Sequence, residues 1–196
     1  MVELPLTMQC DHPHNNFVTK KFEDLDIDKG CCMFVYDKEH EYSNIVKDVK
    51  FGRDFRLGKY FGHTFGDMID SSTEFEDIDF VIPVPLHWRR HYLRGYNQSE
   101  IIAKEIAISL DKELITKGIT RIKSTHPQSR LKNTHERAEN MKNAFRVDTP
   151  ELFHEKHILI VDDVTTTGET IKSMIEALNS ITPAPKISIA TLAATH

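Results

Sequence analysis

One segment carries most of the structural information in this chain: His157-Ile158-Leu159-Ile160-Val161-Asp162-Asp163-Val164-Thr165-Thr166-Thr167-Gly168-Glu169-Thr170. Its run from Ile158 to Val161 is apolar and mostly β-branched, which is typical of a strand buried on both faces of a parallel sheet. Two carboxylates and a threonine-rich loop follow, and apolar residues then recur at helical spacing as far as Leu178. The segment therefore predicts a strand, an acidic pair, a hydroxyl-rich turn and a helix, in that order.

Such a turn is suited to an anion. Ligands of open α/β sheets bind outside the carboxyl ends of the strands, and the free N–H groups at a helix N-terminus attract phosphate. Thr166, Thr167 and Thr170 add hydroxyl donors, and Gly168 allows a close approach of the backbone. A Walker loop is excluded because no Gly-Lys-Ser/Thr follows the glycine.

The acidic pair is suited to a different group. Asp162 and Asp163 repel a phosphate, but they accept hydrogen bonds from sugar hydroxyls and can hold Mg²⁺ directly or through water. Ribose 5-phosphate presents both kinds of group, and we expect it as part of the ligand. The alternative is an ordinary turn with N-capping threonines and solvated aspartates.

Composition limits the class of protein. With 196 residues, 39% hydrophobic and 28% charged, the chain fits one domain that buries a real core. No apolar run approaches the roughly 18 residues that span a bilayer, and the N-terminus does not resemble a signal peptide. The three cysteines form neither a disulfide framework nor C-x2-C pairs. We therefore expect a cytoplasmic protein without a membrane partner. The stretch from Cys10 to His14, together with Cys31 and Cys32, offers ligands for a structural zinc, but the favoured interpretation is a loop, with Cys31 or Cys32 buried in a strand.

The order of elements predicts a largely parallel sheet, because strands and helices mostly alternate. Residues 1–30 form a poorly defined N-terminal segment, and we expect the domain proper at 31–196. Gly58, Gly62 and Gly66 give one smooth helix face, for a neighbouring helix or, in a homodimer, another subunit. Expected strands are 31–36, 80–84, 114–115, 144–147, 158–161 and 187–192; expected helices are 42–51, 55–69, 97–110 and the one that ends near 181.

Two regions are locally basic although the net charge is −5. One follows the proline-stiffened loop at Pro83 and Pro85, and the other covers residues 121–137. The second region could be a solvated loop, a nucleic-acid patch, or a lid over a polyanion. Net acidity argues against nucleic acid as a direct partner, since such partners usually leave a basic footprint on the whole domain.

Three blocks are informative, in this order: Pro83-Val84-Pro85-Leu86-His87 with Arg94-Gly95-Tyr96-Asn97-Gln98; Arg121 to Phe145, with Gln128 and Asn140; and the Asp162-Asp163 loop. Together they resemble the ComF (competence protein F-like) family of type I phosphoribosyltransferases. The resemblance covers roughly residues 31–194. ComF-like proteins usually open with a zinc ribbon that this chain lacks, so its metal is not carried over. Thr166 stands where some purine salvage enzymes have an acid, which weakens a hypoxanthine or guanine assignment.

The resemblance implies a type I phosphoribosyltransferase-like α/β fold, with a mostly parallel twisted sheet flanked by helices and a small hood. It also implies Mg²⁺, held by Asp162 and Asp163, and 5-phosphoribosyl 1-diphosphate (PRPP) as ligand. The implied residues are Asp162, Asp163, Arg121 and Arg137 for catalysis; Asp162, Asp163, Thr165, Thr166, Thr167, Gly168 and Thr170 for PRPP; and Pro85, Leu86, His87, Arg89 and Arg94 for the diphosphate loop.

Two functions follow as hypotheses. The first is an enzyme that transfers phosphoribose to a nitrogen acceptor and releases diphosphate. The alternative is a non-catalytic PRPP- or nucleotide-sensing protein that acts through protein partners, in the manner of competence or DNA uptake. A third hypothesis, nucleic-acid processing through residues 121–137, has the least support.

Overall fold

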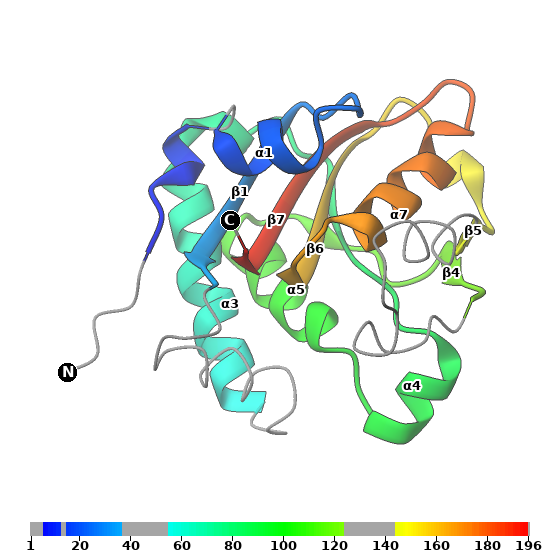
Figure 1. Cartoon of the computed structure of the whole chain (residues 1–196), viewed down its shortest axis with the longest axis horizontal. Coiled ribbons are helices and arrows are strands. Elements are labelled where there is room, and N and C mark those ends of the chain that lie inside the picture. Colours follow the sequence, from blue (N-terminus) through cyan, green and yellow to red (C-terminus); the bar gives the residue numbers. More distant parts are fainter. Residues whose placement is uncertain (1–5, 13–14, 37–54, 124–143, 196) are drawn as a thin grey trace.

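A parallel sheet forms the centre of the molecule. The computed structural model describes residues 6–12, 15–36, 55–123 and 144–195. The five strands lie in the order β1-β7-β6-β2-β3, and every neighbouring pair is parallel. The predicted α/β fold with a mostly parallel sheet is thus confirmed (Figure 1). The strands are β1 (Lys29–Val35), β2 (Phe80–Pro83), β3 (Glu113–Leu114), β6 (His157–Thr165) and β7 (Lys186–Ala194).

Strand β6 is central because its side chains are apolar on both faces. Ile158 and Ile160 belong to one core cluster, Leu159 and Val161 to the other, and all four are fully buried. Each contributes about 1.5–3 kcal/mol through burial. This explains why an uninterrupted apolar run, rather than an alternating one, forms the strand.

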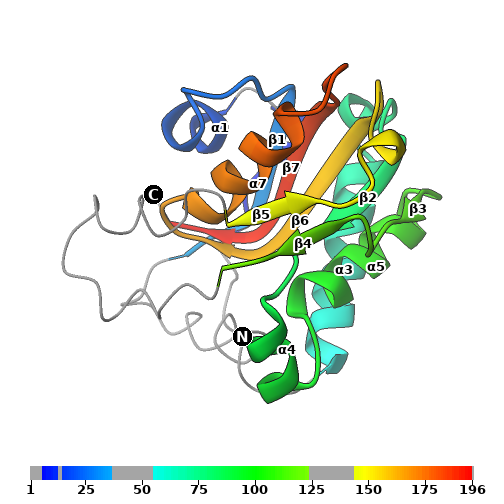
Figure 2. The ribbon, with the colours of Figure 1, turned by 90° about the vertical axis from the view of Figure 1, so that its right-hand side faces the viewer.

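Helices cover both faces of the sheet. Helices α3 (Phe55–Asp70) and α5 (Gln98–Ser109) pack on one face, and α1 (Asn16–Lys21) and α7 (Glu169–Asn179) on the other (Figures 1 and 2). The helices expected at 55–69 and 97–110 are confirmed, whereas the one expected at 42–51 lies outside the described residues. The sequence interpretation did not include α4 (Trp88–Arg94). Short 3₁₀ turns occur at Gln9–Asp11, Thr73–Phe75 and Pro150–Leu152.

The glycine face of α3 packs within the chain, against α5. A Cβ atom on Gly62 would lie 3.1 Å from the backbone Cα and O of Ile102, and one on Gly66 would lie 2.7 Å from Ser109 Cβ. The two helices therefore approach closely only because these residues are glycines. The smooth face has an intramolecular partner.

A small antiparallel ladder stands apart from the main sheet. Strand β4 (Ile119–Arg121) pairs with β5 (Phe145–Val147), so that Arg121 lies opposite Phe145. The strand expected at 144–147 is present, but β4 was not predicted. The basic residues between Lys123 and Ala144, including Arg137, lie outside the described residues.

The N-terminal segment contributes to the core. Phe17, Phe22 and Ile27 belong to the same cluster as Ile158 and Ile160 of β6. The rings of Phe17 and Phe22 meet edge to face, with their centroids 5.5 Å apart. This packing brings α1 onto the α7 side of the sheet, although the sequence of this segment shows no clear periodicity.

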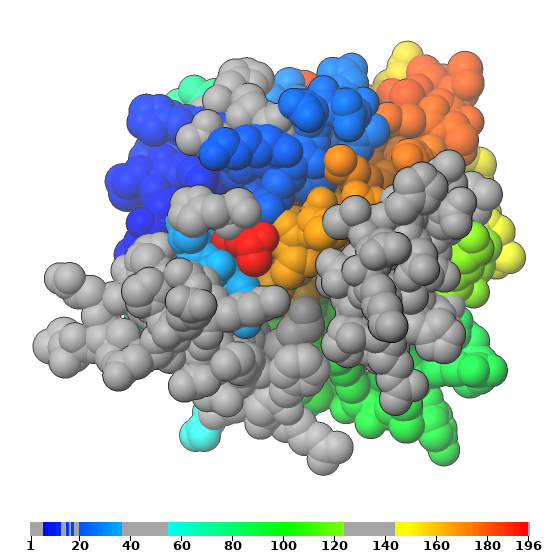
Figure 3. All heavy atoms as spheres, in the orientation of Figure 1, coloured from blue at the N-terminus to red at the C-terminus, as the bar shows by residue number. Residues whose placement is uncertain are grey.

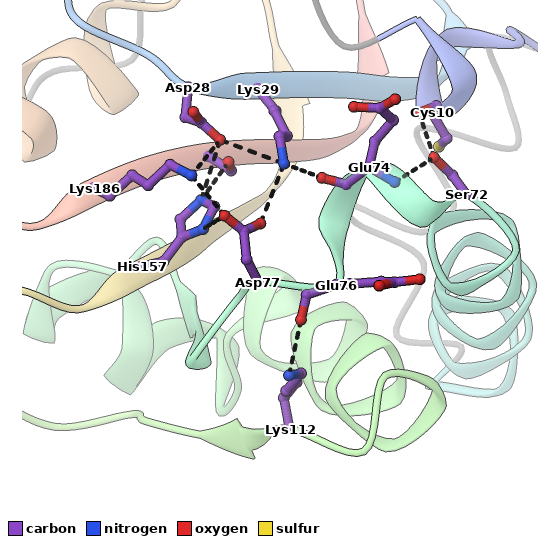
Figure 4. A network of polar contacts seen from close by, with 11 residues as sticks. Cys10, Asp28, Lys29, Ser72, Glu74, Glu76, Asp77, Lys112, His157 and Lys186 are labelled. Carbon is purple, nitrogen blue, oxygen red and sulfur yellow. Dashed lines mark hydrogen bonds and ion pairs between the residues drawn. The ribbon is translucent and has the colours of Figure 1, made fainter.

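A charged network joins the N-terminal ends of the strands (Figure 4). Asp77 contacts His157 Nδ1 at 3.1 Å and Lys186 Nζ at 2.6 Å, and Asp28 contacts Lys186 Nζ at 3.2 Å. Asp28, Asp77 and His157 could converge on a cation, but Lys29 and Lys186 already supply positive charge to these carboxylates. We therefore regard this network as structural.

Among the helices that the structure describes, none is both long and apolar enough to cross a bilayer.

Candidate functional site

The acidic pair stands at the carboxyl end of β6, and its carboxylates are held in place. Asp162 and Asp163 are each 8% exposed. One oxygen of Asp162 accepts hydrogen bonds from the Ser99 hydroxyl at 3.0 Å and from the Asp163 amide at 2.9 Å. One oxygen of Asp163 accepts from the Val164 amide at 2.8 Å. Backbone and hydroxyl donors thus orient both groups before any ligand arrives.

The turn after the pair begins inside the sheet. The hydroxyl of Thr165 donates to Thr191 Oγ1 of β7 at 3.2 Å, so this side chain contacts the neighbouring strand. Thr166 and Thr170 are half-buried. The hydroxyl oxygen of Thr167 is buried and has no hydrogen-bond partner among the described residues. An orphaned buried hydroxyl costs free energy, and a ligand oxygen would satisfy it.

Gly168 has the backbone geometry that makes this turn. Its φ is +82° and it is the N-cap of α7, so no side chain caps that helix end. A Cβ atom at this position would lie 3.0 Å from Phe22 Cε1. A helix N-terminus without a side-chain cap leaves N–H groups for water or for an anion.

A buried arginine of the small ladder interacts electrostatically with Asp162. Arg121 is 7% exposed, and its guanidinium lies over the Phe145 ring, 5.5 Å from the centroid. Burial, and then the positive charge of Arg90, lower the pKa of Arg121 to about 10, while Asp162 acts in the opposite direction. The guanidinium is therefore still protonated at neutral pH and is coupled to both charges.

The loop after β2 ends at a buried histidine. His87 is the N-cap of α4, and its Nδ1 accepts a hydrogen bond from the Arg89 amide at 3.3 Å. Burial, followed by the charges of Arg121 and Arg89, lowers the pKa of His87. A neutral ring with an accepting Nδ1 carries its proton on Nε2. Pro85 and Leu86, which precede it, are half-buried.

The arginines that follow this loop do not occupy equivalent positions. Arg89 is exposed and lies over the Trp88 ring, 5.2 Å from the centroid. Arg94 donates to Gln98 Oε1 at 3.3 Å. Arg90 lies between them in sequence, and its charge affects both His87 and Arg121. The structure thus brings Asp162, Arg121 and His87 together with Arg90, a residue that the sequence interpretation did not select.

Sequence reasoning missed both Arg90 and Ser99. Arg90 follows His87 by one helical turn, but this spacing becomes a signal only once the start of α4 is known. Ser99 reaches Asp162 across 63 positions, and no local pattern reports such a contact.

A cavity of about 200 Å³ lies against the same loop. Pro85 and Leu86 line it, together with Asn97, Glu100, Lys117 and Met174. The aspartates and the threonine turn do not, so this cavity is not the ribose phosphate site.

The chain is similar to known proteins over part of its length. Residues 97–196 match the family model described as the phosphoribosyl transferase domain. The DNA utilization protein YhgH of Salmonella typhimurium is 38% identical over 111 residues, 57% of this chain and 48% of that protein. Competence protein F of Haemophilus influenzae is 33% identical over 102 residues, 52% of this chain and 44% of that protein.

Two solved structures are also similar. The UMP synthase of Leishmania donovani gives a TM-score of 0.40 at 17% identity, covering 76% of this chain and 24% of that chain. The protein TT1426 from Thermus thermophilus gives a TM-score of 0.39 at 14% identity, covering 70% of this chain and 74% of that chain.

The matched domain extends over half of the chain and contains the β6 turn, so the protein belongs to the phosphoribosyl transferase domain family. Its similarity to relatives named for DNA utilization and competence agrees with the resemblance to ComF-like proteins. The chain spans about half the length of the curated relatives it matches.

Proposed function

We propose that this protein binds PRPP with Mg²⁺ and transfers the phosphoribosyl group to a nitrogen acceptor, with release of diphosphate. The observation that carries the proposal is the end of β6, where two oriented aspartates precede a turn with an orphaned hydroxyl and an uncapped helix end. A sugar phosphate needs acceptors for its hydroxyl groups next to hydrogen-bond donors for its phosphate, and this turn has both.

The residues present fit a magnesium ion. Asp162 and Asp163 are the oxygen donors that Mg²⁺ prefers, and with two carboxylates Mg²⁺ would keep water and substrate oxygens as further ligands. When bound there, the ion would take up negative charge on the leaving diphosphate. The orphaned Thr167 hydroxyl follows the second of these aspartates in the same turn, next to the expected phosphate.

Acidic and basic side chains would act on different parts of the substrate. Cleavage of the anomeric C–O bond leaves positive charge on the sugar and negative charge on diphosphate. The carboxylates of Asp162 and Asp163 would stabilise the sugar side, while Arg121 and Arg90, whose charges act on each other, would stabilise the negative charge of the leaving group. The ring of His87 hydrogen-bonds the Ile122 backbone and so ties the loop after β2 to the residue that follows β4. The turn at Thr166 to Thr170 holds the 5-phosphate and fixes the orientation of the ring.

A second candidate is a PRPP-sensing protein that acts through protein partners. Two observations favour it: Thr166 replaces the acid that serves base chemistry in some purine salvage enzymes, and two relatives bear names that refer to DNA utilization and competence. Both candidates require PRPP at the same turn, so binding alone does not separate them.

The deciding experiment is PRPP turnover. Diphosphate release is followed with purified protein, Mg²⁺ and a panel of bases, amines and ammonia, with EDTA as the matched control. Acceptor-dependent, Mg²⁺-dependent release supports the transferase. Tight PRPP binding without release for any acceptor favours the sensor, and absence of PRPP binding contradicts both.

A further inference from the structure

The turn that receives the phosphate is held from outside by the N-terminal segment. Lys21, the last residue of α1, donates from Nζ to the carbonyl oxygen of Thr166 at 2.7 Å and to Thr195 Oγ1 at 3.2 Å. Thr195 Oγ1 donates to the same carbonyl at 3.0 Å. The Thr195 amide also donates to the Thr165 carbonyl at 3.0 Å. A helix near the start of the chain and the residue just after β7 therefore meet on one peptide group of the turn.

These contacts set the direction of the peptide group between Thr166 and Thr167. In a trans peptide the C=O and N–H bonds point in opposite directions. Because the carbonyl of Thr166 points toward Lys21 and Thr195, the amide of Thr167 points away from them. The negative end of the carbonyl dipole, which would repel a phosphate, is thus turned toward Lys21 and Thr195.

The residue after Lys21 supports the same turn by packing. Phe22 is 1% exposed, and its ring would lie 3.0 Å from a Cβ atom on Gly168. Lys21 and Phe22 therefore contact two positions of the turn, Thr166 and Gly168, from the same side. Figure 3 shows the C-terminal end of the described chain (red) at the surface beside the β6–α7 region (orange).

The ammonium group of Lys21 has no ion-pair partner among the described residues. Lys21 is half-buried, and burial lowers its pKa. Its contacts are to a carbonyl and a hydroxyl, and the ion pairs found among the described residues do not include it. A partly desolvated cation that contacts neutral groups gains from an anion nearby. The turn at the N-terminus of α7 is the place where such an anion would bind.

We propose that Lys21 is a positioning residue for the phosphate turn: it fixes the Thr166–Thr167 peptide and adds a positive charge at the 5-phosphate end of the ligand. This rests on the proposed binding of PRPP and extends it to a segment that precedes the matched domain. Arg121 and Arg90 serve the diphosphate end, so the two ends of the ligand have separate cations.

Because different cations would serve the 5-phosphate and the diphosphate, ligands that carry only one of these groups can test the role of Lys21. Lys21→Met keeps the aliphatic chain and removes the charge and its donors. Lys20→Met, at the exposed neighbouring position, is the matched control. Calorimetry is done with PRPP, ribose 5-phosphate and inorganic diphosphate. Lys21→Met should weaken PRPP and ribose 5-phosphate by the same factor, about tenfold, as expected for a lost hydrogen bond to a charged group. Its affinity for diphosphate should equal that of the wild type.

Each outcome decides something. Unchanged ribose 5-phosphate affinity in a folded Lys21→Met variant overturns the inference, and an equal loss for all three ligands shows a general structural effect and overturns it too. If wild-type protein binds no PRPP but binds inorganic phosphate in a Lys21-dependent way, the proposed function fails and the anion-site role of Lys21 stands. If it binds neither, both fail.

A second variant tests the same contact in case Lys21→Met does not fold. Thr195→Val removes the hydroxyl that shares the Thr166 carbonyl but keeps the Lys21 charge. It should weaken ribose 5-phosphate less than Lys21→Met does, about threefold, with diphosphate unchanged. Equal ribose 5-phosphate affinity in Thr195→Val and wild type contradicts the shared carbonyl contact.

Discussion

Single side chains in this site are held by contacts made before any ligand binds. Asp162 and Asp163 each have an oxygen fixed by a backbone amide, and Arg121 is buried against an aromatic ring. Because they are withdrawn from water, their charges interact more strongly with a ligand than surface charges would. One acidic and one basic side chain of this site can be tested separately.

Asp163→Asn should abolish measurable Mg²⁺-dependent PRPP binding and leave the fold intact. The amide oxygen can still accept from the Val164 amide, so only the charge and a metal ligand are lost. We expect a loss of about 3 kcal/mol or more, roughly a hundredfold in affinity. Calorimetry with PRPP and Mg²⁺ measures it, with Asp70→Asn, an exposed position, as control. PRPP affinity equal to that of the wild type would remove Asp163 from the site.

Arg121→Lys should reduce the affinity for inorganic diphosphate by about tenfold, or about 1.4 kcal/mol. A lysine keeps the charge but cannot present the planar fork that binds two phosphate oxygens at once. Arg146→Lys is the matched control, because Arg146 lies on the paired strand β5 with its side chain 63% exposed. Equal diphosphate affinity in the two variants would contradict the role of Arg121.

At the scale of elements, the packing of α3 on α5 holds α5 in the position from which Ser99 donates a hydrogen bond to Asp162. Ser99 lies in the first turn of α5, and α5 is held against α3 by the glycine face. The sequence identified that face by its spacing. It could not say which helix covers it, because the partner depends on the path of the chain.

Gly62→Ala should destabilise the protein by about 1–3 kcal/mol, although alanine favours a helix by about 1 kcal/mol over glycine. The new Cβ would lie 3.1 Å from the backbone of Ile102, which cannot rotate away. Gly58→Ala is the control, since its Cβ would meet Ile101 Cγ2 at 3.2 Å, the end of a side chain. Urea unfolding of both variants measures the difference, and equal midpoints would refute this account.

At the scale of the whole molecule, the two ends of the parallel sheet carry different groups of polar side chains. The carboxyl ends of the strands carry the candidate site, and the opposite ends carry the network of Asp77, His157 and Lys186 (Figure 4). His157 is 4% exposed, and its Nε2 lies 2.8 Å from Ser188 Oγ. Burial lowers the pKa of His157, and the nearby Asp77 only partly offsets this effect.

Stability should therefore fall as the pH decreases through about 6.5, the pKa of an unfolded histidine. The unfolded chain takes up the proton at a higher pH than the folded chain does, so acid favours unfolding. His157→Gln should lose part of this dependence, and His87, whose pKa is also lowered, should account for another part. Melting temperatures of wild type and His157→Gln between about pH 7.5 and 5.5, on either side of that pKa, test this. Parallel curves would exclude a contribution from His157.

The amino-acid sequence by itself determined the local pattern around β6: a buried strand, two acids, a hydroxyl-rich turn and a helix. It also determined the parallel sheet, because an apolar run buried on both faces requires helices on both sides. These properties follow from neighbours in the chain, which periodicity and turn chemistry report directly.

Only the tertiary structure decided which distant residues meet at that turn. Lys21 and Thr195 reach Thr166, Ser99 reaches Asp162, and Arg90 is coupled to Arg121, each across a long separation in sequence. Such contacts depend on how helices and strands pack, and no local spacing encodes them. The physical reason is that a binding site is assembled from several chain segments, whereas sequence patterns record the preferences of one segment at a time.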